Sequence, residues 1–225
     1  YDLVDGKLKF GGYYKMPAPQ AEEENCVAHN GSIIPVPGRD IFVQAWYQGG
    51  VSVVDFTDSS KPVEIAYFDR GPIDMDHLIL GGYWSTYWYR GHIYGAEIAR
   101  GIDVFSLKPS AVLSDNEIAA AALGDQGGVF NPQDQYPVTW PAEPVVARAY
   151  IDQLARDEAL SAAELKSLNA ALDEAASKLA GGAKDPALAK KLRSLANVKE
   201  TDAAIIAKRR AGLRDTLSAI AARLR

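Results

Sequence analysis

The stretch "AWYQGGVSVVDFTD", residues 45–58, decides the fold class of the N-terminal half of the chain. It runs from an extended aromatic segment through a Gly-Gly turn into alternating Val residues, a pattern typical of antiparallel strands. A weaker copy, "EIARGIDVFSL", follows at residues 97–107. Aligning Gly50 with Gly101 places Val51 and Val53 on Ile102 and Val104. The N-terminal half is therefore predicted to contain a repeated unit.

Short strands separated by turns extend on both sides of this stretch. The sequence predicts strands at 32–36, 41–47, 51–56 and 63–68, and in the second copy at 84–89, 92–98 and 102–107. No helical pattern interrupts them, which indicates an antiparallel meander. Sheets of about four strands that repeat every 40 to 50 residues or so are typical of propeller blades. We therefore expect residues 1–110 to form a partial β-propeller of about two antiparallel blades.

Two segments resemble the bacterial LVIVD-repeat β-propeller proteins. They are "AHNGSIIPVPGRDIFVQAWYQGGVSVVDFTDSSKPVEIAYFDRGP", residues 28–72, and "GGYWSTYWYRGHIYGAEIARGIDVF", residues 81–105, about half of the chain. Asp55 occupies the acidic position after the repeat's apolar strand, and Ser106 replaces it in the second copy. The resemblance implies a secreted or cell-surface bacterial protein with a non-catalytic binding or scaffolding function. Because a propeller needs about four to eight blades, we expect this chain to be the C-terminal part of a larger one, with further blades upstream.

The second half of the chain has a different composition, dominated by good helix formers. A short helix with a capping box, Ser114 to Glu117, and a Pro-rich linker are expected within residues 111–143. Residues 144–225 contain further capping signals, such as Ser161 to Glu164, and Leu stripes at helical spacing. This pattern predicts an all-α C-terminal bundle of three or four antiparallel helices.

Composition and motifs exclude several classes of function. The net charge of −5 comprises +4 in residues 151–225, which leaves −9 for residues 1–150. An acidic N-terminal part argues against binding nucleic acid, and the absence of a long apolar run predicts no membrane span. Cys26 is the single cysteine, so internal disulfides and Cys-rich zinc sites are excluded. The sequence has no GxSxG, HExxH or P-loop motif.

Histidines and acidic residues suggest two alternative metal sites. His29, in "CVAHNGS", either hydrogen-bonds the backbone of a blade corner or binds a metal in the central channel. In the loop "DMDHL", the side chains of Asp74, Asp76 and His77 either form an oxygen-rich cation site or a solvated acidic turn. Some propeller oxidases that look related bind a metal through histidines. The alternative function is therefore a metal-dependent, oxidoreductase-like enzyme holding a divalent or transition metal, with Tyr94 and Glu97 behind the ligands.

Aromatic residues suggest a ligand-binding surface. Trp46, Trp84 and Trp88 lie on or beside predicted strands, next to several Tyr residues. Such rings either stack on a sugar or an apolar ligand or fill the space between blades. The sequence therefore predicts a binding module for a glycan or a protein partner, with no cofactor established.

Overall fold

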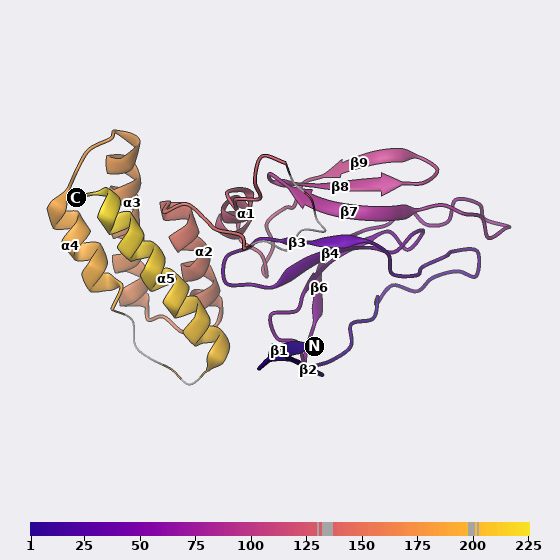
Figure 1. The fold of residues 1–225 in the computed structure, drawn as a ribbon, viewed down its shortest axis with the longest axis horizontal. Helices are drawn as coiled ribbons and strands as arrows, with labels where there is room; N and C mark the ends of the chain where they lie inside the picture. The colour runs from indigo at the N-terminus through magenta and orange to yellow at the C-terminus, as the bar shows by residue number, and fades with distance from the viewer. Residues whose placement is uncertain (130, 132–136, 198–200, 202) are drawn as a thin grey trace. The chain divides into compact units, whose positions relative to one another are not determined.

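The computed structural model describes residues 1–129, 131, 137–197, 201 and 203–225 (Figure 1). The chain divides into two compact units. The β-sheet unit comprises Tyr1–Pro35, Arg39–Lys108 and Gln126–Pro137, and the helical unit comprises Val36–Gly38, Pro109–Asp125 and Val138–Arg225.

The part of the β-sheet unit that the structure describes contains three small antiparallel sheets. Strands β1 (Asp2–Val4) and β2 (Lys7–Lys9) form a hairpin. A four-stranded sheet has the order β3 (Gly31–Ile34), β4 (Ile41–Ala45), β5 (Val51–Asp55) and β6 (Val63–Phe68), and a three-stranded sheet has the order β7 (Tyr83–Tyr89), β8 (His92–Glu97) and β9 (Gly101–Phe105). The predicted antiparallel meander is confirmed. The described residues form no closed sheet and no propeller.

The two larger sheets pack on each other through apolar side chains. Figure 1 shows β7 beside β3 and β4, and both strands contact it. Alternation along the strands supplies the buried residues, because every second side chain points to the same face. The core of this interface includes Ile34, Ile41, Val43, Val51, Val53, Trp88 and Ile93.

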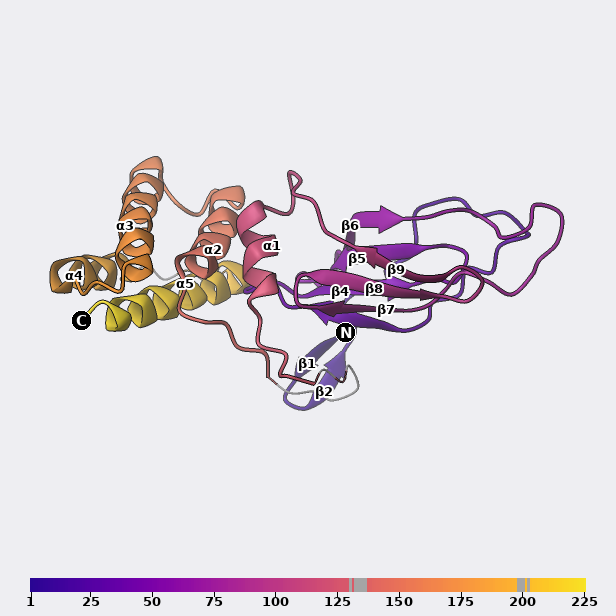
Figure 2. The same ribbon diagram turned by 90° about the horizontal axis from the view of Figure 1, so that it is seen from above.

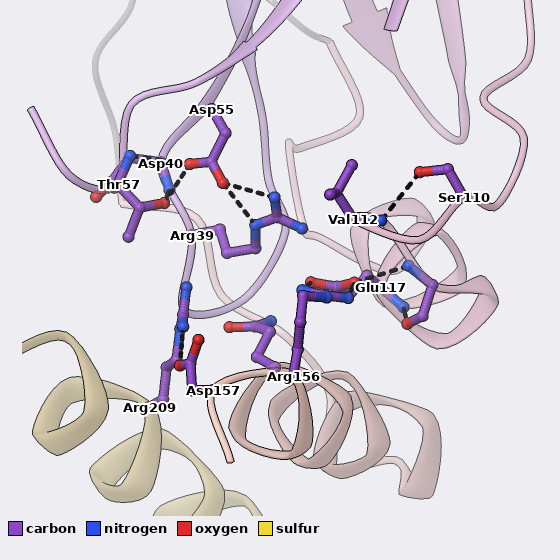
Figure 3. Close-up of polar contacts among 12 residues, drawn as sticks. Arg39, Asp40, Asp55, Thr57, Ser110, Val112, Glu117, Arg156, Asp157 and Arg209 are labelled. Atoms are coloured by element: carbon purple, nitrogen blue, oxygen red, sulfur yellow. Dashed lines mark hydrogen bonds and ion pairs between the residues drawn. The ribbon is translucent and has the colours of Figure 1, made fainter. Parts of the chain in front are cut away.

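The acidic residue that ends β5 stabilises the turn before β4. Asp55 Oδ2 accepts hydrogen bonds from Arg39 Nη2 at 2.6 Å and Nε at 3.1 Å (Figure 3). Its Oδ1 accepts bonds from the Thr57 amide and hydroxyl at 2.9 and 2.6 Å, and Thr57 Oγ1 accepts one from the Asp40 amide. Burial alone would raise the pKa of Asp55, but the Arg39 charge and these hydrogen bonds hold it below its ordinary value.

This depressed pKa predicts an acid-sensitive contribution to stability. A carboxyl whose folded pKa is lowered contributes stability above its unfolded pKa of about 3.9, and that contribution is lost as pH falls through the folded value. We expect the wild type to be more stable than Asp55→Asn at neutral pH, with a difference that shrinks below about pH 4. Urea unfolding of both proteins across this range measures it. A difference that is constant with pH would contradict the assignment.

The described residues of the helical unit form five helices. They are α1 (Asp115–Ala122), α2 (Pro144–Arg156), α3 (Ala162–Ala180), α4 (Pro186–Leu195) and α5 (Ala204–Arg223). Both predicted capping boxes are present, at Ser114 with Glu117 and at Ser161 with Glu164. The prediction of a helical C-terminal region is confirmed, and α1, expected as a minor element of the linker, packs against α2. In the described part of residues 144–225 there are four helices, α2 to α5, which agrees with the three or four that the sequence predicted.

Leucine and alanine side chains form the core between these helices. Helix α5 runs past α2 and α4 (Figure 2), and it contacts both. Gly212 makes the approach to α2 possible, because a Cβ there would lie 2.3 Å from the Tyr150 ring. The fully buried large residues are Ile151, Leu154, Leu172, Leu192, Leu213, Leu217, Ile220 and Leu224, with Leu113 before α1.

Charged pairs connect the helices at the edge of this core. Glu117 is fully buried, and its carboxylate accepts a hydrogen bond from Arg156 Nη2 at 2.6 Å (Figure 3). Arg209 of α5 pairs with Asp157 at the end of α2. Of the helices in the described residues, none is long and apolar enough to cross a lipid bilayer.

Candidate functional site

Gln48 fixes the loops at one end of the two larger sheets. It lies in the β4–β5 turn and is 3% exposed. Its side-chain amide donates to the Ile79 carbonyl at 2.7 Å, and its Oε1 accepts a bond from the Ile73 amide at 2.8 Å. Its backbone amide donates to the Asn25 carbonyl at 2.9 Å. The side chain of Gln48 therefore ties the loop before β7 to this turn, and its backbone amide ties the segment before β3 to the same turn.

Three aromatic rings meet at these loops and form what we call the Trp84 platform, made of His29, Tyr47 and Trp84. The His29 ring centroid lies 4.2 Å from that of Trp84 and 4.8 Å from that of Tyr47. Tyr47 and Trp84 are arranged edge to face at 5.9 Å. Trp84 is 48% exposed, so the platform presents an aromatic surface to solvent.

The backbone holds this platform in place. Tyr47 has a positive φ of 51°, which is uncommon for a residue other than Gly and indicates a conformation imposed by its surroundings. Its amide and carbonyl both bond to Tyr83, at 3.1 and 2.8 Å. Trp84 is the extra residue of a β-bulge, because Tyr83 and Ser85 pair with the adjacent residues Glu97 and Ala96. Bulges redirect side chains, and this one turns the indole toward solvent.

The position of His29 defines its tautomer. Its Nδ1 lies 2.5 Å from the Trp84 carbonyl oxygen, and because a carbonyl only accepts, Nδ1 carries the proton. In the neutral ring, Nε2 then has a free lone pair that can accept a hydrogen bond or bind a metal. The hydrogen bond to the Trp84 carbonyl is the kind of backbone contact that the blade-corner interpretation of His29 predicts. The metal interpretation would use the other ring nitrogen, Nε2.

The other two predicted ligand-binding Trp residues lie elsewhere. Trp88 is fully buried, and its amide donates to Ser32 Oγ at 2.8 Å across the two sheets. Its ring therefore packs in the core, and the ligand-binding interpretation does not fit it. Trp46 is partly buried, with its ring 6.0 Å from that of Tyr14, and does not share in the platform's ring contacts.

Glu97 and Tyr94, the residues predicted to lie behind metal ligands, occupy opposite faces of β8. Glu97 is 4% exposed, and its Oε1 accepts a bond from the Gly82 amide at 2.5 Å. Its Oε2 accepts a second bond from the Arg100 amide. Tyr94 is 39% exposed on the other face. The Glu97 carboxylate therefore fixes the backbone just before β7 and in the β8–β9 turn.

The Asp74 loop has the geometry of a turn. Asp74 Oδ1 accepts bonds from the amides of Asp76 and His77 at 2.8 and 2.9 Å, and His77 Nδ1 lies 3.2 Å away. The hydrogen bond from the Asp76 amide, followed by that from His77, lowers the pKa of Asp74. All three residues therefore lie in a local turn, and Asp74 Oδ1 contacts both Asp76 and His77.

The metal hypothesis stays a prediction. Within the part of the chain that the structure describes, no group of three or more His, Cys, Asp or Glu side chains is placed to hold a metal ion. A metal at His29 would need ligands from outside these residues. The deciding measurement is the metal content of protein purified without chelators, beside that of His29→Ala. Stoichiometric transition metal that disappears in the variant would support the enzyme alternative.

A second polar cluster, which the sequence did not predict, anchors the loop between β6 and β7. Arg70 binds both oxygens of Asp103 at 2.7 and 2.9 Å, and Tyr83 donates to Asp103 Oδ2 at 2.5 Å. The Arg70 guanidinium also lies over the Phe68 ring at 5.2 Å. Burial, helped by the Asp103 bond, raises the pKa of Tyr83 above its ordinary value. Arg70 and Asp103 are 33 residues apart in the sequence, so no local motif predicts their contact.

An apolar cavity of about 280 Å³ lies between the two larger sheets. Val51, Val53, Ala66, Phe68, Ile93 and Phe105 form its apolar wall, and Ser106 and Lys108 add polar groups. The residues that line this cavity do not include those of the Trp84 platform. Its small volume, near the lower limit for ligand pockets, makes it the weaker candidate of the two.

No family model, no curated protein and no solved structure matches the chain. The LVIVD-repeat resemblance therefore rests on the motifs in residues 28–105 alone.

Proposed function

We propose that the β-sheet unit is a non-catalytic binding module and that its Trp84 platform binds a carbohydrate. The observation that carries the proposal is the half-exposed indole of Trp84, held by a bulge and flanked by His29 and Tyr47. An exposed large ring beside fixed loops is a feature of binding surfaces, because loops on a rigid scaffold carry function.

The chemistry of the platform suits a sugar ring. The C–H groups on one face of a pyranose pack against an indole, while its hydroxyls need hydrogen-bond partners at the edge. Nε2 of His29 supplies an acceptor beside the ring, since Nδ1 donates to the Trp84 carbonyl. The fixed backbone of Tyr47 reduces the entropy lost when a ligand orders the surface.

We infer further that the binding module belongs to a larger propeller of the LVIVD type. The second sheet repeats the antiparallel meander of the first, and β9 pairs with β8 as β5 pairs with β4. These features support blade-like repeats of the LVIVD type within a larger propeller. Secretion or cell-surface placement in a bacterium, where glycan ligands are abundant, is part of the same proposal.

Titration of oligosaccharides against intrinsic Trp fluorescence tests the function. We expect saturable binding by the wild type, and in Trp84→Ala a dissociation constant raised by about tenfold or more, equivalent to about 1.4 kcal/mol. Because Trp84 is half-exposed, the variant should keep its fold, which near-ultraviolet circular dichroism checks. Isothermal titration calorimetry of the same ligands confirms the affinities without relying on the indole signal.

The matched control is Tyr67→Ala, which removes an aromatic ring that is 75% exposed on β6 and away from the platform. Its affinity should equal that of the wild type. Unchanged emission across a broad glycan panel would remove the carbohydrate proposal. Sugar binding that survives in Trp84→Ala would place the site elsewhere.

A further inference from the structure

The cavity between the two larger sheets has apolar walls from both of them. The first sheet contributes two register pairs, whose side chains share one face: Val51 with Phe68 and Val53 with Ala66. The second sheet contributes Ile93 and Phe105, which also pair with each other. The ring centroids of Phe68 and Phe105 are 4.8 Å apart. An aromatic contact between the two sheets therefore forms one boundary of the cavity.

This cavity is large for a space between two packed sheets. Protein interiors are close-packed and leave few voids larger than a water molecule, whereas this one measures about 280 Å³. Two residues before Phe68 on the same strand, the wall has only the methyl group of Ala66, which leaves room next to the aromatic contact. Poorly ordered water is displaced favourably by an apolar group, and apolar walls give water few hydrogen-bond partners. The cavity therefore favours an apolar occupant over water.

The rim of the cavity carries a positive charge. Ser106 and Lys108 follow β9, are exposed, and line the cavity. Among the residues that the structure describes, Lys108 is the only charged one in this lining, and it forms no ion pair with them. The half of the chain that contains Lys108 is acidic, since residues 1–150 have a net charge of −9. An unpaired cation beside an apolar space favours an occupant with a negatively charged group.

We propose that this cavity binds a small aromatic carboxylate, whose rings lie between the sheets and whose carboxylate contacts Lys108 and Ser106. The aromatic contact between the sheets offers ring edges and faces against which a further ring packs favourably. An apolar cavity of about 150 Å³ in another protein binds benzene, so a cavity of about 280 Å³ suits a body of two fused rings. The Ser106 hydroxyl lies 3.1 Å from His92 Nδ1, and a hydroxyl that accepts such a bond can still donate its own proton to a carboxylate. This inference does not depend on carbohydrate binding, because no residue of the Trp84 platform lines the cavity.

Isothermal titration calorimetry of the full chain with naphthoate tests the proposal. We expect saturable one-to-one binding, and binding about fivefold weaker for naphthamide, which has the same rings without the charge. Lys108→Gln should weaken naphthoate binding by about fivefold and leave naphthamide within about twofold of its wild-type affinity, because only the charged ligand pairs with the lysine. Lys108→Glu should reverse the preference, so that the cation naphthylmethylamine binds more tightly than naphthoate. Because Lys108 is exposed, both variants should keep their fold, which near-ultraviolet circular dichroism checks.

Further variants separate the cavity from other parts of the surface. Ala66→Phe fills the cavity and should abolish the binding of naphthoate and naphthamide alike. Lys61→Gln, the control for Lys108→Gln, removes an exposed lysine of the β5–β6 turn and should leave the naphthoate affinity unchanged. If Ala66→Phe does not fold, the comparison of the two lysine variants decides. The proposal would be overturned by the absence of saturable binding up to about 1 mM naphthoate, or by equal affinities in Lys108→Gln and Lys61→Gln. Loss of naphthoate binding in Trp84→Ala would also overturn it, because the ligand would then occupy the Trp84 platform.

Discussion

Replacement of Arg39 by alanine is expected to lower the free energy of unfolding of the β-sheet unit by about 3–5 kcal/mol. Arg39 is 7% exposed, and its guanidinium makes two hydrogen bonds to Asp55, whose side chain is 20% exposed. Without Arg39, the carboxylate keeps its two Thr57 bonds but loses its counter-charge in a poorly solvated position. Breaking one side of a buried pair costs more than the pair itself contributes, since a charge is left uncompensated.

Urea unfolding followed by Trp fluorescence measures this loss. Arg100→Ala is the control, because Arg100 is an exposed arginine in the β8–β9 turn and its removal should change stability by no more than about 0.5 kcal/mol. Arg39→Lys is a second test: it keeps the charge but cannot present the planar fork, so its stability should fall between wild type and alanine. An Arg39→Ala protein as stable as Arg100→Ala would show that the pair contributes little.

The local parts of the fold were predictable from the sequence because their causes are local. Alternating Val and Ile residues around the Gly49-Gly50 turn predict β4 and β5, and the capping boxes at Ser114 and Ser161 predict the starts of α1 and α3. The strand predicted at 41–47 ends at Ala45, where the chain turns toward the positive φ of Tyr47. Such boundaries depend on neighbours that the local pattern does not contain.

The candidate site was only partly predictable because it depends on contacts distant in sequence. Trp84 and Trp88 lie four residues apart on one strand, so the sequence pattern does not distinguish them. The bulge at Trp84 gives the two side chains different environments. Trp88 is buried between sheets, whereas Trp84 is half-exposed. Gln48 and Glu97 likewise bond to backbone groups that are distant in the sequence. Gln48 bonds to Ile79, 31 residues away, and Glu97 bonds to Gly82, 15 residues away. Neither residue belongs to a motif that could have indicated this.

In the helical unit, Leu217→Ala is expected to cost about 2–5 kcal/mol of unfolding free energy. Leu217 is fully buried near the middle of α5, next in its stripe to Leu213 and Ile220. Helix α5 has no side-chain hydrogen bond at its N-cap, so packing rather than capping holds it. Truncating the central leucine therefore removes both apolar burial and the contacts that keep α5 against α2 and α4.

Circular dichroism at 222 nm during urea unfolding measures this prediction against a neighbour on the same helix. Ser218→Ala changes an exposed residue whose hydroxyl donates to the Arg214 carbonyl, a bond that adds little in water, so stability should stay within about 0.5 kcal/mol of wild type. Leu217→Met nearly conserves volume and should lose less than about 1.5 kcal/mol. Equal losses in Leu217→Met and Leu217→Ala would mean that side-chain volume does not set the cost at this position. A loss in Leu217→Ala no greater than in Ser218→Ala would mean that the α5 stripe is not the core of the unit.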